Sequence, residues 1–481
     1  MSLVTEGEAM RMLERGEWVE ENFAGCELGH VKRTRRLMVM AENMLECPEV
    51  SLPRQNVEWS DVKAAYRLCD RDEVTFPAVA ECHWRRVRQT PPGVHLLISD
   101  TTDINQYTHP ATTGLGMLGD GQGRGLQLHS CLVVEAATGV VEGLAAAKVF
   151  YRRPSPKKET RAQRLNRPRE SSLWGDVVDQ AGLPPAGSQW VHVFDRGGDN
   201  FESMCHIAAQ RCDWVIRASK LKRKVLLDSG KQMASGQHGA EGSGPLVALD
   251  QAIQTATLVG SYQLSLRSRP GQAARVASLN VRTLRVAFPA PAEKSRYVKA
   301  CGINQIPLNV VIVEEVNAPK GVTPIRWVLL TSLPVETLDQ AWTVIGYYEL
   351  RWTIEEYHKV LKTGCGVEQH SLRTAARLEP LIGLISVVGV RLLQLKTISK
   401  HEPDAKARHR VPTLWLMALK KRKPKLAPRD LTVYEFFREL AKLGGFLGRK
   451  HDGEPGWQTL WTGHQRLQAL IQGLQLAASK T

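Results

Sequence analysis

Apolar and polar residues follow two different periods along this chain, and the changes of period divide it into segments. Residues 1 to about 90 have helical spacing, and Val31–Ala41 interleaves basic and apolar side chains. A Pro-Pro-Gly sequence at 91–93 ends this segment as a linker would. Helical spacing returns from Leu338 to about Ile398, and the rest of the chain is helical with basic and Gly/Pro interruptions.

The part after the linker has the patterns of strands. Val94–Asp100 is an apolar run, Leu126–Glu135 alternates, and a tight turn at 136–139 precedes Val140–Leu144. Short connections between them predict an antiparallel start to a sheet. Trp190–Asp195 and Asp213–Arg217 predict two more strands, separated by a short helix at 200–210. Strand and helix alternate, which predicts an α/β core.

Two further segments differ from this core. Residues 220 to about 320 are richer in Gly, Ser and Pro and contain short β-like stretches, which predicts a β-rich insertion. Leu381–Leu395 is the most apolar stretch, but it contains Arg391 and is shorter than the roughly 20 residues of a membrane span. We therefore expect a buried helix there and no membrane partner.

Composition narrows the class of protein. A chain of 481 residues suggests about three domains. Lys and Arg (64) exceed Asp and Glu (49) by 15, which favours a polyanionic partner such as nucleic acid. The nine cysteines are scattered without zinc-finger spacing, and the N-terminus has no signal-peptide pattern, so we expect a reduced, cytoplasmic protein.

Candidate chemistry lies at the ends of two predicted strands and on one helix. Asp100 and Asp195 each follow an apolar strand, where a carboxylate can reach substrate, although an Asp that caps a turn is an equal alternative. The helix at 348–362 carries Tyr348, Arg351, Glu355 and Lys362 within an arc of about 60° at roughly 100° per residue. Such a face suits phosphate and metal handling, and it equally suits a solvated, salt-bridged surface.

These four residues form the pattern Y-(2)-R-(3)-E-(6)-K, which resembles the signature of bacterial cut-and-paste DDE transposases of the insertion-sequence-four group. Leu96–Thr102, Val193–Asp199 and Trp327–Glu336 are similar to the segments around that family's catalytic residues. Leu28–Leu37 and Leu443–Phe446 extend the resemblance over most of the chain. One departure is Gly197, where the family often has Glu.

The resemblance implies an α/β fold in which a β-rich insertion interrupts an RNase H-like catalytic core, with helical N- and C-terminal domains. The expected domains are an end-DNA-binding domain at 1–90, a core at 91–219 and 320–380, the insertion at 220–319 and a dimerisation domain at 381–481.

The resemblance also implies the chemistry. Asp100, Asp195 and Glu355 would bind two Mg²⁺ ions, for which Mn²⁺ can substitute, because carboxylates are hard oxygen donors. The enzyme would release a 3′-OH at each end of the transposon, pass through a hairpin and join the end to target DNA. It would act as a homodimer on paired ends of double-stranded DNA, in the bacterial cytoplasm with the nucleoid.

Several DNA contacts are implied as well. Tyr348, Arg351 and Lys362 would contact phosphates, and Trp327 would stack on a flipped base, with a core tryptophan as the alternative. The basic side chains of the N-terminal segment would read the transposon end, with a solvated helix face as the alternative. They are Lys32, Arg33, Arg35 and Arg36.

His358 follows Glu355 on the same helix, and we expect a structural histidine rather than a general base. Two other functions stay open at this point. One is an RNase H-like nuclease that cuts without joining, and the other is a non-catalytic DNA-binding regulator of transposition.

Overall fold

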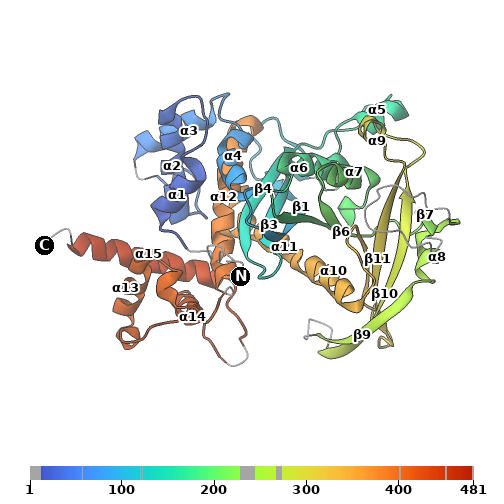
Figure 1. Cartoon of the computed structure of the whole chain (residues 1–481). Helices are drawn as coiled ribbons and strands as arrows, with labels where there is room; N and C mark the ends of the chain where they lie inside the picture. The colour runs from blue at the N-terminus through green and yellow to red at the C-terminus, as the bar shows by residue number, and fades with distance from the viewer. Residues whose placement is uncertain are drawn as a thin grey trace.

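The computed structural model describes residues 12–478 apart from 57, 120, 122, 228–243, 267–272, 400–401 and 450–451. Within this part the strands form one mixed sheet of 12 strands, and helices cover both of its faces (Figure 1). The first strands are antiparallel, with β3 between β1 and β4, and β5 and β6 then continue the sheet parallel to β1. Their bounds are β1 Gly93–Asn105, β3 Gly123–Glu135, β4 Val141–Phe150, β5 Ser188–Phe194 and β6 Asp213–Arg217, with the short β2 Gly116–Leu118 on β3.

The strands of the 220–320 region extend the same sheet. β12 pairs with β6 on one side and with β11 on the other, so the sheet runs without a break from β1 to β10. Figure 1 shows this half as a long, curved extension. The bounds are β7 Lys224–Leu227, β8 Leu246–Ala248, β9 Thr257–Leu266, β10 Arg275–Pro289, β11 Gln305–Val316 and β12 Arg326–Thr331. Three short helices complete this side of the molecule, α5 Arg161–Asn166, α8 Leu249–Ile253 and α9 Arg296–Cys301.

Successive residues of the central strands enter opposite cores, as the period of a strand requires. On β1, Leu96 and Ile98 belong to one buried cluster and Leu97 to the other. The first cluster includes the helices α4, α10, α11 and α12, and the second includes α6 and α7. The bounds are α4 Phe76–Val87, α6 Leu173–Ala181, α7 Phe201–Ala209, α10 Leu338–Leu350, α11 Trp352–Lys359 and α12 Ala375–Ile398.

The expected buried helix is α12. It is long and apolar enough to cross a membrane by length and composition, but 89% of its most apolar window is buried inside the protein. α4 and α15 pack against it. Burial of nearly the whole surface explains why its apolar residues have no clear amphipathic period.

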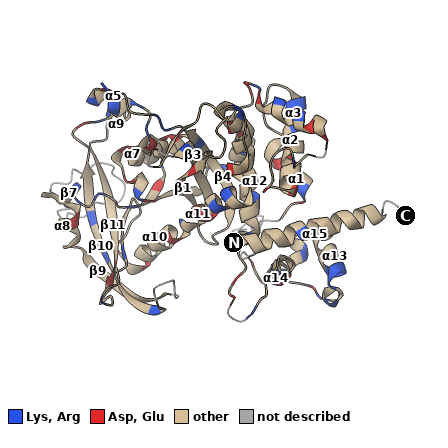
Figure 2. Ribbon diagram, turned by 180° about the vertical axis from the view of Figure 1, so that it is seen from behind, with Lys and Arg blue, Asp and Glu red and all other residues tan. Residues whose placement is uncertain are grey.

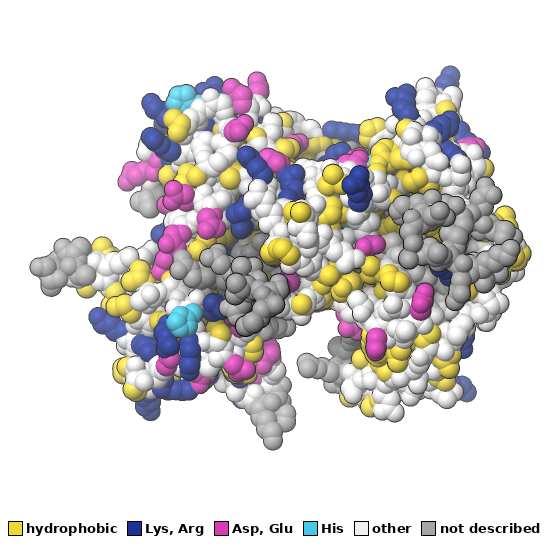
Figure 3. All heavy atoms as spheres, in the orientation of Figure 1, with side chains coloured by type: hydrophobic (Ala, Val, Ile, Leu, Met, Phe, Trp, Pro, Cys, Tyr) yellow, Lys and Arg dark blue, Asp and Glu magenta, His cyan; other side chains and the backbone are white. Residues whose placement is uncertain are grey.

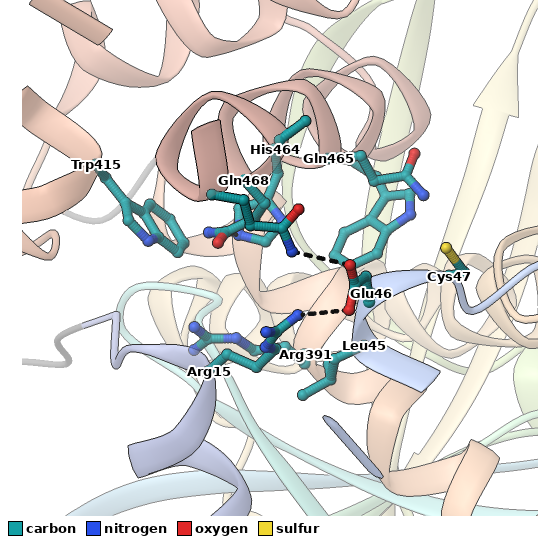
Figure 4. Close-up of a pocket in the computed structure, with 12 residues that line it drawn as sticks. Arg15, Leu45, Glu46, Cys47, Arg391, Trp415, His464, Gln465 and Gln468 are labelled. Carbon is teal, nitrogen blue, oxygen red and sulfur yellow. Dashed lines mark hydrogen bonds and ion pairs between the residues drawn. The ribbon is translucent and has the colours of Figure 1, made fainter. Parts of the chain in front are cut away.

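Helices of the two terminal regions lie on the same side of α12 (Figure 1). They are α1 Arg15–Phe23, α2 Val31–Glu46 and α3 Trp59–Cys69 in the N-terminal region, and α13 Thr413–Arg422, α14 Val433–Leu443 and α15 Trp457–Ala478 in the C-terminal region. A cavity of about 240 Å³ lies where these regions meet (Figure 4). At its edge Glu46 accepts hydrogen bonds from Arg15 at 3.2 Å and from Gln472 at 2.8 Å.

Two expectations about local structure are wrong. β1 does not end at Asp100 but continues to Asn105, because residues 101–105 keep their pairing with β3. The helix expected at 348–362 is broken at Arg351, and its last turn, Val360–Gly364, is a π-helix. A π-turn holds an extra residue, so the angle of 100° per residue no longer applies at Lys362.

Candidate active site

Two of the candidate carboxylates are neighbours because of the register between β1 and β5. These strands are parallel, and Ser99 pairs with Phe194 as the last pair of the ladder. Asp100 is the next residue on β1 and Asp195 is the first residue after β5, so the two lie near each other where the β1–β5 pairing ends. Asp100 Oδ1 accepts the N–H of Thr101 at 2.7 Å, and Asp195 Oδ1 accepts the N–H of Gly197 at 2.7 Å.

The third carboxylate comes from α11, which packs against β1. Arg351 links the two elements, because its Nη1 lies 3.0 Å from Asp100 Oδ2 and 3.3 Å from Glu355 Oε1. Its Nη2 lies 3.3 Å from the same Glu355 oxygen. Figure 2 shows acidic and basic positions close together where α11 passes β1. Sequence positions about 250 residues apart therefore meet at one point.

The negative charges of Asp195 and Glu355 lie close enough to Asp100 to affect its pKa. Burial raises the pKa of Asp100 to about 6, and the negative charges of Asp195 and Glu355 act in the same direction. The Thr101 N–H and the Arg351 guanidinium partly oppose this rise, because both stabilise the ionised form. A carboxyl whose pKa is raised by burial and by nearby carboxylates is typical of catalytic sites.

Trp327 and Tyr348 form the wall next to Arg351. Their ring centroids are 5.4 Å apart in an edge-to-face arrangement, and the Arg351 guanidinium lies 5.9 Å from the Tyr348 ring centroid. Trp327 is partly buried on β12, whereas Tyr348 is only 6% exposed. The structure therefore gathers Tyr348 and Glu355 around Arg351, which contacts Asp100, with Trp327 packed against Tyr348.

Lys362, the fourth residue of the pattern, lies farther along β1. Its Nζ is 3.9 Å from Glu368 Oε1, and the same Glu368 oxygen accepts the N–H of Asn105 at 2.9 Å. Lys362 and Glu368 line an open cleft of about 330 Å³ together with Asp103 and Asn105. Lys362 thus lies near the C-terminal end of β1 and not beside Asp100.

His358 is buried, and burial lowers its pKa to about 3. The imidazole is therefore neutral at physiological pH, and its role as a structural histidine stays a prediction. Two contacts near the site were not predicted from the sequence. His129 hydrogen-bonds the Thr101 hydroxyl at 2.7 Å, and the buried carboxylate of Asp199 pairs with Arg223 at 2.7 Å. An apolar strand that contains a histidine, such as Leu126–Glu135, was the available signal for the first.

The basic residues of α2 divide into two pairs. Arg33 pairs with Glu73 at 3.0 Å and Arg36 with Asp61 at 2.7 Å, whereas Lys32 and Arg35 are exposed. Basic and acidic side chains are mixed over the N-terminal helices in Figure 3. Two of the four cations are thus neutralised within the region itself.

Three family models match consecutive parts of the chain. They are a transposase DNA-binding model over residues 15–74, a transposase DDE domain over 191–388 and a Tn5 transposase dimerisation domain over 387–481. In this order they define the class of protein: the chain is a DDE transposase with regions for DNA binding and for dimerisation. The match of its C-terminal region makes it a Tn5-like member of that class. The DDE match includes Asp195 and Glu355, whereas Asp100 precedes it.

Proposed function

We propose that Asp100, Asp195 and Glu355 are the catalytic residues of this transposase, and that it cuts DNA at transposon ends and joins the freed ends to target DNA. The observation that supports this proposal most strongly is the register of β1 and β5, which makes Asp100 and Asp195 neighbours, with Glu355 joined to Asp100 through Arg351. Long-range convergence of three carboxylates costs electrostatic energy and has no evident structural purpose.

Divalent metal ions are the general cofactors of DDE transposases, and the chemistry of these residues suits them. Carboxylate oxygens are the donors that Mg²⁺ and Mn²⁺ prefer. Burial raises the pKa of Asp100, repulsion from Asp195 and Glu355 adds to the rise, and a bound cation would relieve that repulsion. In the described residues no three His, Cys, Asp or Glu side chains stand at metal-binding spacing, and Arg351 bonds two of these three carboxylates. When bound, a pair of such ions would activate water and stabilise the developing charge on both oxygens of the phosphodiester.

The surrounding side chains would hold the DNA. Arg351 and Lys362 carry the charges that bind phosphate oxygens, and the Tyr348 hydroxyl can donate a hydrogen bond to one. The Trp327 ring, edge-on to Tyr348, offers a surface for a base that leaves the duplex when a hairpin forms. We assign end binding to the N-terminal helices and a homodimer on paired ends to the C-terminal region, in line with the matched family models.

Duplexes that carry the two terminal sequences of the element, incubated with the purified protein and Mg²⁺, test the proposal. We expect release of a 3′-OH, a hairpin product and joining to a target plasmid. Asp195→Ala should abolish all three, because it removes one of the neighbouring carboxylates. Asp176→Ala is the matched control, because its carboxylate is exposed and pairs with Lys148 on another part of the core. Equal cleavage by the wild type and Asp195→Ala would refute the assignment, and cleavage without joining would reduce the protein to a nuclease.

A further inference from the structure

The guanidinium of Arg351 hydrogen-bonds two of the carboxylates to which we assign the metal. Nη1 bonds both Asp100 and Glu355, and Nη2 bonds Glu355, at distances of 3.0 to 3.3 Å. The side chain is 14% exposed, so water screens these contacts weakly. In the part of the chain that the structure describes, Arg351 pairs with these two carboxylates and not with Asp195.

A guanidinium in this place competes with a metal ion for the same oxygens. Mg²⁺ binds carboxylate oxygens at about 2.0–2.1 Å, so an ion shared by Asp100 and Glu355 would lie within a few ångströms of the Arg351 nitrogens. Two cations at such a separation in a partly buried site repel strongly. Arg351 in this position therefore disfavours a metal ion bound to Asp100 and Glu355.

DNA offers Arg351 a replacement for its carboxylate partners. Phosphate oxygens accept two parallel hydrogen bonds from a guanidinium, as a carboxylate does. Arg351 lies at the break between α10 and α11, next to the Tyr348 ring, which can hold the cation when it moves.

We infer that Arg351 is a DNA-controlled occupant of the metal site: in the DNA-free protein it neutralises Asp100 and Glu355, and a phosphate of the bound transposon end draws it away so that a divalent cation can replace it. This inference rests on the proposed function of the three carboxylates. It couples the two ligands, so that DNA strengthens metal binding and metal strengthens DNA binding by the same factor.

Binding of Mn²⁺ to the full-length protein, followed by the loss of the electron paramagnetic resonance signal of free Mn²⁺, tests the inference without any catalytic step. In the absence of DNA we expect Arg351→Ala to bind Mn²⁺ at least about tenfold more tightly than the wild type, because one nearby positive charge is removed. Arg410→Ala is the matched control. It breaks an ion pair with Glu402 in the C-terminal region and removes the same charge, so its Mn²⁺ affinity should equal that of the wild type.

Addition of a duplex with the element's terminal sequence completes the test. It should tighten Mn²⁺ binding to the wild type by a factor similar to that of Arg351→Ala, and tighten binding to Arg351→Ala far less. Arg351→Lys, which keeps a cation but loses the two-pronged contact, should fall between them and serves if the alanine variant fails to fold, as judged by its circular dichroism.

The outcomes separate the two proposals. Equal Mn²⁺ affinity of the wild type, Arg351→Ala and Arg351→Lys without DNA would overturn the inference and leave the metal site in place. If Asp195→Ala, introduced into Arg351→Ala, left Mn²⁺ binding unchanged, the ion would bind elsewhere and the proposed function of the carboxylates would fail.

Discussion

The turn after Asp195 has no room for a side chain at Gly197, so a substitution there should disturb the active site. A Cβ at this position would lie 2.8 Å from Trp174 Cζ2 and 3.0 Å from Asp195 Oδ1, closer than a Cβ normally lies to other heavy atoms. Trp174 cannot move freely, because it is buried and packs against His129 and Phe194 with centroid distances of 4.6 and 4.8 Å.

Gly197→Ala should therefore displace the turn and with it the Asp195 carboxylate. Relief of both contacts needs a shift of several tenths of an ångström, and overpacking of this kind costs about 1–3 kcal/mol. A displacement of about 1 Å at a catalytic group can cost about 100-fold in rate, so we expect the smaller shift here to slow cleavage by about 10- to 100-fold. Binding of end DNA by the N-terminal region should not change.

Single-turnover cleavage of an end duplex in Mg²⁺ measures this effect. Gly346→Ala adds the same methyl group on α10, where a Cβ meets no atom within 4 Å, and should leave the rate unchanged. Trp174→Phe removes the Cζ2 atom and should restore part of the rate when it is combined with Gly197→Ala. An unchanged rate in Gly197→Ala, or no coupling between the two substitutions, would refute the reasoning.

Three other predictions follow from single contacts. Replacement of the exposed Lys32 or Arg35 by Ala should lower the salt dependence of end-DNA binding by about one released ion each. Arg36→Ala loses only an internal ion pair with Asp61 and should leave the salt dependence unchanged. Filter binding measured from low to moderate salt distinguishes these outcomes. Trp327→Ala should leave the first nick intact and slow hairpin formation, resolved on denaturing gels. His83 is buried, and burial lowers its pKa well below 6.5, so the unfolded chain gains a proton that the folded chain does not. The free energy of unfolding should then fall by about 1.4 kcal/mol per pH unit below about pH 6.5, and His83→Gln should remove that contribution in urea titrations at pH 5 and 7.

Local pattern was sufficient where burial decides the structure. The apolar run at 94–100, the alternation at 126–135 and the helix at 200–210 correspond to β1, β3 and α7, because each must bury one or both faces. The apolar stretch around Arg391 corresponds to the core of α12. The class of protein also followed from sequence, since the signature residues Tyr348, Arg351 and Glu355 are a specific combination.

Pattern failed where long-range pairing decides. β1 continues beyond Asp100 because β3 supplies partners for residues 101–105, and no local feature of that polar stretch signals a strand. The helix expected at 348–362 breaks at Arg351, whose side chain is bound to Asp100 on another element. Lys362 was expected on the same face as Glu355, but the π-turn at 360–364 places it beside Glu368.

These failures concern the same few residues, and they have a common cause. β1 continues beyond Asp100, and the helix breaks at Arg351, whose guanidinium contacts the Asp100 carboxylate. Both features place charged side chains close together in a largely buried part of the fold. Each departs from the local optimum, and such departures are expected where a protein must hold a functional arrangement. In the DNA-free protein the cluster of Asp100, Asp195 and Glu355 needs a compensating positive charge, because three carboxylates repel one another. Arg351 provides that charge in a form that a phosphate can remove, whereas a permanently buried ion pair would close the site to metal.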